Sequence, residues 1–245
     1  MSKTPWQSVL VTGAGSGVGR AVAQALHNRG LKVALMGRQL DKLQETAKLL
    51  GGESDRVLIE ACDVADRKAL GEAVARIEKS FGSIDVLVSN AGINVPKRTL
   101  DQLDPADWDK MIATNLTGSF NLAHFVLPGM RTRGSGLVVQ ICSISGLRAS
   151  QLGGAGYSAS KFGQAALGIC LGREERSRGI KSTVIYPGEI NTPILDRRPV
   201  PVPAERKAII LQPEDVAAAV GFAVDLPTHA SVPELVIMPA SDDWA

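Results

Sequence analysis

The segment Thr12-Gly13-Ala14-Gly15-Ser16-Gly17-Val18-Gly19 decides how this chain folds, because it joins an apolar run to an amphipathic one. The apolar run over residues 8–12 predicts a buried strand, and the pattern over residues 17–29 predicts a helix. Glycines at such a junction permit a tight turn and let bare backbone approach a pyrophosphate at the positive end of the helix. The spacing Thr-Gly-x-x-x-Gly-x-Gly differs from the usual dinucleotide fingerprint, but its place after the first strand indicates the same kind of site.

Apolar runs and amphipathic stretches alternate along the rest of the chain. The predicted strands are residues 8–12, 32–36, 56–61, 86–89, 136–142, 182–186 and 234–238. The predicted helices are residues 17–29, 39–50, 66–80, 105–130, 155–178 and 213–225. Most strand runs are continuous in Val, Ile and Leu, as expected for strands that helices cover on both faces. We expect an α/β fold: one domain over residues 1–245 with a Rossmann-type, doubly wound parallel sheet of about seven strands flanked by helices.

Composition narrows the class of protein. The 245 residues carry 27 basic and 25 acidic side chains, and a net charge of +2 predicts no nucleic-acid partner and no anionic membrane partner. Residues 1–7 lack the apolar core of a signal peptide, and no apolar run has membrane-spanning length. The three cysteines lack metal-type spacing, so we expect reduced core residues, no metal and a cytoplasmic protein.

Tyr157 and Lys161 are four residues apart, so on a helix they share a face. A phenol has an ordinary pKa of about 10 and is a poor acid-base group at neutral pH. Lowering that pKa by about two to three units requires about 3–4 kcal/mol, and a cation at about 4 Å, in an effective dielectric near 20, supplies about 4 kcal/mol. The pair alone is an ordinary surface feature of a helix. Beside a nucleotide-binding loop it predicts an acid-base site.

Six motifs occur in one order along the chain: the glycine segment, Asn90-Ala91-Gly92, Asn115, Ser143, the pair Tyr157 and Lys161, and Pro187-Gly188. Together they resemble the short-chain dehydrogenase/reductase family over essentially the whole chain. The resemblance implies an NAD(P)(H)-dependent oxidoreductase that interconverts a ketone or aldehyde with its alcohol by hydride transfer. A non-catalytic NADP-binding regulatory protein is one alternative. An epimerase or dehydratase is another, although such relatives are longer and carry an additional substrate lobe.

The resemblance also assigns catalytic roles. Tyr157 exchanges a proton with the substrate oxygen, while Lys161 lowers the pKa of Tyr157 and binds the nicotinamide ribose. Asn115 holds a water that relays protons to Lys161; the alternative is a helix-interior asparagine that bonds locally.

The catalytic serine is either Ser143 or Ser145. Ser143 is preferred because the family serine usually stands three residues before a glycine, here Gly146, and it can hydrogen-bond the developing oxyanion. The separation of 14 residues from Ser143 to Tyr157 is one more than the common family value. It implies a slightly longer loop over residues 147–156.

The second predicted strand ends at Met36-Gly37-Arg38, where an acidic residue would bind the ribose hydroxyls of NAD. Arg38 instead presents a charged fork suited to a 2′-phosphate, so NADP(H) is expected to be preferred over NAD(H). Ser16 stands where many NADP-using relatives carry a second basic residue, and a solvated surface charge is the alternative for Arg38. By resemblance, Asp63 contacts the adenine and Thr192 the nicotinamide amide. The expected cofactor-binding residues are Gly13, Ser16, Gly17, Val18, Gly19, Arg38, Asp63, Val64, Asn90, Gly92, Tyr157, Lys161, Pro187, Gly188, Ile190 and Thr192.

The substrate side is less determined. Residues 191–212 hold four prolines and follow the sixth predicted strand, so we expect a substrate loop there. The stretches 211–217 and 232–239 resemble a subgroup that includes 3-hydroxy acid dehydrogenases. Three arginines, Arg148, Arg197 and Arg198, suit either a substrate carboxylate or solvent.

A homodimer or homotetramer is expected. The interior glycines of the helix that bears Tyr157, Gly163 and Gly168, each cost about 1 kcal/mol. They call for a compensating close approach by a second chain or by the protein's own sheet. In the family, this helix and the helix over 105–130 pair with their symmetry mates.

Overall fold

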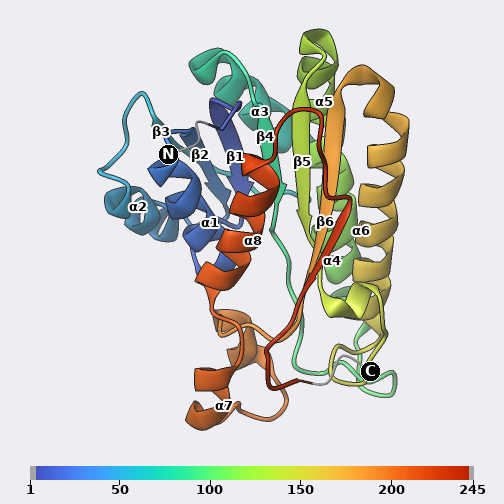
Figure 1. Ribbon diagram of the computed structural model, residues 1–245. Helices are drawn as coiled ribbons and strands as arrows, with labels where there is room; N and C mark the ends of the chain where they lie inside the picture. Colours follow the sequence, from blue (N-terminus) through green and yellow to red (C-terminus); the bar gives the residue numbers. More distant parts are fainter. Residues whose placement is uncertain (1–3, 243–245) are drawn as a thin grey trace.

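The protein is represented by a computed structural model that describes residues 4–242, apart from the side chain of Arg197. Seven parallel strands form one sheet in the order β3-β2-β1-β4-β5-β6-β7, with helices packed on both faces (Figure 1). The strands are β1 Ser8–Thr12, β2 Lys32–Gly37, β3 Val57–Ala61, β4 Val86–Ser89, β5 Gly136–Ile141, β6 Ile180–Pro187 and β7 Glu234–Ile237. The helices are α1 Gly17–Asn28, α2 Leu40–Leu49, α3 Arg67–Phe81, α4 Pro105–Met111, α5 Gly118–Arg133, α6 Ala155–Glu174, α7 Ala204–Ile209 and α8 Pro213–Asp225. The predicted fold class is confirmed.

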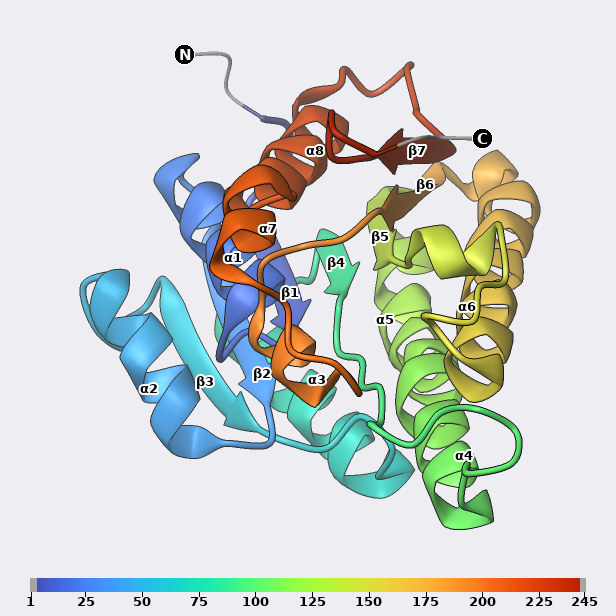
Figure 2. The same cartoon turned by 90° about the horizontal axis from the view of Figure 1, so that it is seen from below.

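Two apolar cores lie on opposite faces of the sheet, which explains the continuous apolar strands. One core joins the sheet to α1, α2 and α8, and the other joins it to α3 and α5. Figure 2 looks along the sheet and shows the two helical layers on either side of it. Alternate residues of a strand serve opposite cores: Val9 and Val11 belong to the first, and Leu10 between them to the second.

The order of strands reverses beside β1. The chain moves from β1 outward to β2 and β3, then returns to place β4 on the other side of β1. The loops that follow β1 and β4 therefore diverge at the carboxyl end of the sheet. Such a reversal is where open α/β sheets bind ligands.

The helix predicted over residues 105–130 is interrupted in the structure. Between α4 and α5 the residues Ile112–Thr117 form a π-helical turn, which carries one more residue per hydrogen-bonded ring than an α-helix. Apolar periodicity did not reveal this turn, because the chain stays helical throughout. The other predicted boundaries lie within one or two residues, apart from the 155–178 helix, which ends at Glu174 before a 3-10 turn at Arg176–Arg178.

The predicted loop 191–212 has regular structure of its own. A 3-10 turn spans Pro193–Arg197, α7 follows, and a parallel bridge joins Ile190 to Leu211. The segment thus leaves the sheet and returns beside its point of departure. In the part of the chain from residue 4 to residue 242, no helix is long and apolar enough to cross a membrane.

Candidate active site

A cleft of about 410 Å³ opens at the carboxyl ends of the strands, where the strand order reverses. The predicted residues that line it are Gly13, Ser16, Gly17, Val18, Arg38, Asp63, Val64, Asn90, Gly92, Tyr157, Lys161, Ile190 and Thr192. The lining does not include five other predicted site residues: Gly19, Asn115, Ser143, Pro187 and Gly188. Among residues 4–242, no group of three or more His, Cys, Asp or Glu side chains is arranged to hold a metal ion.

The glycine loop is shaped by steric limits at three positions. Gly13 and Gly17 have φ angles of 65° and 48°, a backbone region that favours glycine. A Cβ added at Gly19 would overlap the carbonyl oxygen of Gly13, so α1 can begin this close to the loop only with glycine there. The predicted need for glycine thus has a geometric cause at each position, and it leaves bare backbone facing the cleft.

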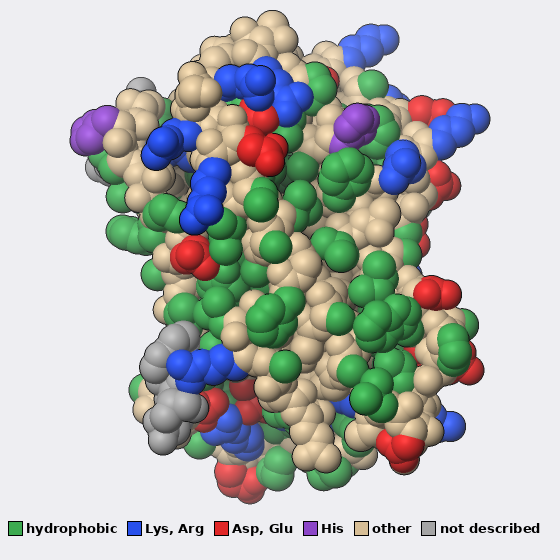
Figure 3. Space-filling model, turned by 90° about the vertical axis from the view of Figure 1, so that its right-hand side faces the viewer, with side chains coloured by type: hydrophobic (Ala, Val, Ile, Leu, Met, Phe, Trp, Pro, Cys, Tyr) green, Lys and Arg blue, Asp and Glu red, His purple; other side chains and the backbone are tan. Residues whose placement is uncertain are grey.

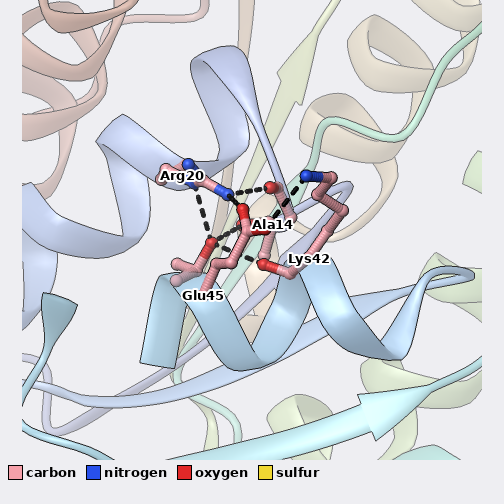
Figure 4. Close-up of polar contacts among 6 residues, drawn as sticks. Ala14, Arg20, Lys42 and Glu45 are labelled. Atoms are coloured by element: carbon pink, nitrogen blue, oxygen red, sulfur yellow. Dashed lines mark hydrogen bonds and ion pairs between the residues drawn. The ribbon is translucent and has the colours of Figure 1, made fainter. Parts of the chain in front are cut away.

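Side chains from α1 and α2 hold the carbonyl groups of this loop (Figure 4). The Arg20 guanidinium donates to Gly15 O at 2.6 Å and pairs with Glu45 at 3.0 Å. Thr46 Oγ1 donates to Ala14 O at 2.9 Å. Lys42 Nζ reaches the same Glu45 carboxylate at 3.0 Å. These bonds hold the carbonyl groups of Ala14 and Gly15 in place.

Two cations lie at the adenosine end of the cleft. Arg38 follows β2, and its NH1 atom lies 3.8 Å from Asp63, which follows β3. Lys42, in the first turn of α2, also lines the cleft, and the sequence analysis did not single it out. The available signal was its spacing, since Lys42 stands four residues after Arg38 at the start of a helix. Asp63, predicted to meet the adenine, here faces Arg38.

The catalytic candidates meet at the other end of the cleft. Tyr157 and Lys161 project from α6, and the Ser143 hydroxyl, just beyond β5, lowers the pKa of the Tyr157 phenol. Lys161 Nζ lies 5.7 Å from the centre of the Tyr157 ring. Ser145 is buried, its backbone N–H donates to Ser143 Oγ at 3.1 Å, and its hydroxyl lies beside Gly153. Of the two serines, Ser143 is the one whose hydroxyl acts on the pKa of the phenol.

The acidity of the phenol differs from the sequence prediction. Burial raises the pKa of Tyr157 to about 12, while the hydrogen bond from Ser143 and the charge of Arg98 act in the opposite direction. Burial also lowers the pKa of Lys161. The raised pKa of the phenol contradicts the lowering that we expected from Lys161. Burial is the largest influence on the phenol, and it favours the protonated form.

Asn115 connects the catalytic helix to the loop after β4. Its Oδ1 accepts from Ile93 N at 2.8 Å, and its Nδ2 donates to Ile93 O at 3.0 Å and to Ser160 Oγ at 2.9 Å. It lies in the π-helical turn and is fully buried. The alternative of local helical bonding is therefore wrong, because these side-chain contacts reach residues 22 and 45 positions away.

An apolar group packs together with the Tyr157 ring: Ile93, Val95, Leu103 and Met111. Arg98 is buried nearby, and its guanidinium donates to Val95 O at 2.8 Å and to Leu152 O at 2.9 Å. The sequence analysis passed over Arg98, because a single arginine in a loop carries no pattern. Its charge acts on both Tyr157 and Arg198.

The loop 191–212 is anchored by a group of charged residues. Glu189, after β6, lies against Arg198 and Arg206, and the Arg206 guanidinium also donates to Asp242 at 2.8 Å. Arg198, considered for a substrate carboxylate, is thus engaged by a carboxylate of the chain itself. Arg148 is exposed, and the Arg197 side chain lies outside the described residues. Thr192 Cγ2 packs beside Gly17, which brings this loop to the glycine loop.

Comparisons with known proteins agree with this geometry. Residues 7–200 match the family model of the short chain dehydrogenases. An uncharacterized oxidoreductase of Staphylococcus aureus (strain MRSA252) is 36% identical over 231 residues, covering 94% of this chain and 96% of that protein. Another, from Staphylococcus haemolyticus (strain JCSC1435), is 34% identical over 98% of this chain and 100% of that protein.

Solved structures give the same result. A closed form of serine dehydrogenase complexed with NADP+ has a TM-score of 0.89 and 30% identity, covering 98% of this chain and 97% of that one. An alcohol dehydrogenase from the archaeon Thermococcus sibiricus, complexed with 5-hydroxy-NADP, has a TM-score of 0.85 and 28% identity, covering 97% of this chain and 98% of that one. The chain belongs to the short chain dehydrogenase family. It is an oxidoreductase of the NAD(P)-dependent class that acts on CH–OH groups and the corresponding carbonyls.

Proposed function

We propose that the chain is an NADP(H)-dependent reductase or dehydrogenase of a small carbonyl or alcohol substrate, with Tyr157 as its acid-base group. The Ser143 hydroxyl beside the Tyr157 phenol, which lines a cleft that begins at the glycine loop, carries the proposal. Both hydroxyls are then available to one substrate oxygen, Tyr157 to give or take its proton and Ser143 to stabilise its negative charge. Lys161 assists by its positive charge, and Asn115 fixes the loop beside them.

The residues of the cleft fit a nicotinamide dinucleotide. The bare glycine backbone suits a pyrophosphate, and Thr192 and Lys161 lie where a nicotinamide riboside would be held. Such a cofactor supplies or accepts the hydride, while the protein orients the substrate and moves the proton. Gly188 packs closely against the segment that follows β7, since a Cβ there would collide with Met238 and Pro239.

A preference for NADP(H) over NAD(H) follows from Arg38 and Lys42 together. Ser16 supplies no charge, but Lys42 reaches the same part of the cleft from α2 and provides a second cation. A phosphate placed between Arg38 and Lys42 would make charge-assisted contacts with both. The serine dehydrogenase and the archaeal alcohol dehydrogenase to which this chain is similar were both solved with NADP-type cofactors, which supports the proposal.

The substrate is proposed to lie between the apolar group beside Tyr157 and the segment 191–212. Both belong to the single domain that we propose for residues 1–245. Ile93, Val95, Leu103 and Met111 favour a compact carbon skeleton. Because serine dehydrogenases are among the similar structures, 3-hydroxy acids and the corresponding carbonyl acids are the first compounds to test. The positive charge of Arg98 near Tyr157 is compatible with an acidic substrate.

We further propose a homodimer or homotetramer. The interior glycines of α6 do not support it, since Gly163 packs against Leu116 and Gly168 against Val184 of the same chain. The support comes from exposed aromatic residues, Phe120 on α5 and Phe162 on α6. Figure 3 shows hydrophobic side chains gathered on the face that includes α6. Light scattering that finds a monomer at micromolar concentration would contradict this proposal.

The redox state of the cysteines is relevant to the cellular compartment of the protein. Cys62, Cys142 and Cys170 are all free thiols, which suits the reducing cytoplasm that we propose.

One experiment tests the function directly. The purified protein is mixed with NADPH and a panel of small ketones, aldehydes and carbonyl acids, and the loss of nicotinamide absorbance is followed. Turnover of at least one carbonyl class is expected. Tight NADPH binding without turnover of any compound in either direction would favour the regulatory alternative and contradict the proposed enzyme.

A further inference from the structure

The ammonium of Lys161 is held from behind by neutral acceptors. Nζ donates to Ile141 O at 3.0 Å and to Gln164 Oε1 at 2.7 Å. The lysine is 3% exposed and Gln164 is fully buried. Two of the three ammonium hydrogens are thus committed inside the protein, and the third is left to the cleft that Lys161 lines.

The orientation of the Gln164 amide is fixed by its other end. Gln164 Nε2 donates to Ser119 Oγ at 3.0 Å and to Gln140 Oε1 at 3.2 Å. Ser119 Oγ in turn donates to the backbone oxygen of Asn115 at 2.8 Å. Reversing the amide would point N–H groups at an ammonium and an oxygen at the Gln140 oxygen. The bonds therefore determine that the oxygen faces Lys161.

The identity of the residue at position 164 affects the charge felt by the phenol. A carboxylate there would neutralise the ammonium, and an apolar side chain would leave a buried cation with one partner fewer. Over residues 4–242, no Asp or Glu forms an ion pair with Lys161. The other ionisable groups that face this centre are the Tyr157 phenol on α6, the Cys142 thiol after β5 and Arg98 after β4.

We propose that Gln164 is a positioning residue: it holds the Lys161 ammonium toward the cleft with its charge uncompensated, and thereby sets the pH at which Tyr157 ionises. This inference rests on the proposed function of Tyr157 and Lys161. It adds a residue that has no contact with the cleft. A glutamine provides an acceptor of the right length without a negative charge.

The composition of the chain permits a direct test. Tyr157 and Tyr186 are the two tyrosines of the sequence. Burial and the hydrogen bond to Glu234 raise the pKa of Tyr186, and Tyr186→Phe removes its signal altogether. In this background, ultraviolet absorbance of tyrosinate reports Tyr157 alone. The titration is done with oxidised dinucleotide bound and needs no turnover.

Gln164→Met keeps the length of the side chain and removes the acceptor, and Gln164→Glu keeps the acceptor and adds a charge. Both are expected to raise the titration midpoint of Tyr157 by about one pH unit, a tenfold change in its ionisation constant. The acid limb of kcat/KM for alcohol oxidation should move by the same amount. Ser89→Ala is the matched control, since Ser89 bonds Ser119 at 3.1 Å in the same network without touching Lys161.

An unchanged midpoint in folded Gln164→Met, or in Gln164→Glu where the first variant does not fold, would overturn the inference. A shift of equal size in Ser89→Ala would also overturn it, because the effect would then belong to the network as a whole. The proposed function has a separate test in Tyr157→Phe. If Tyr157→Phe lost turnover and Gln164→Met left the titration midpoint unchanged, the proposed function would be retained and only the positioning role of Gln164 would be rejected.

Discussion

The Ser143 hydroxyl acts on the Tyr157 phenol and lowers its pKa, although α6 and the end of β5 bring the two side chains from separate parts of the chain. In the proposed reaction, both hydroxyls would act on one substrate oxygen. Burial raises the pKa of Tyr157 to about 12, which favours the protonated form of the phenol.

Tyr157→Phe keeps the ring and removes the transferable proton. Turnover should fall at least about a hundredfold, a typical contribution of general acid-base catalysis, whereas NADPH binding measured by fluorescence should be retained. Phe in place of Tyr preserves the packing against Ile93 and Val95, so thermal unfolding serves as the control. Near-normal turnover would exclude Tyr157 as the acid-base group.

The two neighbouring serines should respond differently to alanine substitution. Ser143→Ala removes the hydroxyl that acts on the phenol and should lower kcat by about a hundredfold or more. Ser145→Ala should have a mild effect, since the Ser145 hydroxyl lies beside Gly153. Steady-state kinetics of the pair decides the matter. The reverse ranking would show that Ser145 is the catalytic serine.

Arg38 and Lys42 should both contribute to selection of the 2′-phosphate. Arg38→Ala is expected to reduce kcat/KM with NADPH by about ten- to a hundredfold, the value of a charge-assisted contact of about 1.5–3 kcal/mol, and to leave NADH nearly unchanged. Lys42→Ala should lower it by about three- to tenfold, because its ammonium is shared with Glu45. Lys48→Ala, exposed on the same helix, is the control. Equal or better kcat/KM with NADH in the unmodified protein would refute the assignment.

Arg206 should hold the segment 191–212 in place, because it joins Glu189 to Asp242. In Arg206→Met the Glu189 carboxylate loses one of its two cations, and local opening should become easier by about 1 kcal/mol. Proteolysis within the segment is expected to accelerate about fivefold, and KM for the substrate should rise. Lys207→Met, at the next position, removes a more exposed and longer ion pair and should change little. The same cleavage rate in both variants would argue against the anchoring role.

Glu175 provides a pH-dependent link between α5 and α6. Hydrogen bonds from Arg131 and Arg178 lower the pKa of this carboxyl, which is 2% exposed, to about 2. A carboxyl with a lowered pKa stabilises the fold above its ordinary pKa of about 4.5, and that contribution is lost as the pH falls toward 2. At neutral pH, Glu175→Gln should cost on the order of 1–3 kcal/mol in the free energy of unfolding.

The difference in the free energy of unfolding between Glu175→Gln and the unmodified protein should shrink as the pH falls from about 4.5 to 2. Denaturant unfolding at several pH values would measure it. Glu174→Gln, exposed at the preceding position, is the control. A difference that stays constant down to pH 2 would exclude an electrostatic origin.

Sequence patterns predicted the sheet well, for a physical reason. Strands covered on both faces must be apolar throughout, so β1, β4 and β5 were visible as continuous runs. The glycines of the first loop were equally informative, since the close approach of Gly13 and Gly19 excludes any side chain. Local rules decide such features, and a single sequence contains them.

Contacts between segments that are distant in the sequence could not be predicted from local patterns. Lys42 and Arg98 reach the site only through the placement of α2 and of the loop after β4, and neither stands in a periodic pattern. The acidity of Tyr157 was misjudged because spacing on a helix shows proximity to Lys161 but not the depth of burial. Burial acts on both partners, and the direction of the pKa follows from the packed structure.

The π-helical turn at Ile112–Thr117 determines how α4 is rotated about the helix axis relative to α5. Each residue of an α-helix advances by about 100°, so an extra residue within this turn rotates α4 relative to α5 by roughly that angle. Met111, packed beside Tyr157, lies before the turn, and Ser119, bonded to Gln164 of the catalytic helix, lies after it, so the turn sets how these two residues meet α6. Removing a single residue here would rotate α4 relative to α5 and move the two contacts apart around the helix. In this enzyme, the number of residues between α4 and α5 thus affects the geometry of the active site.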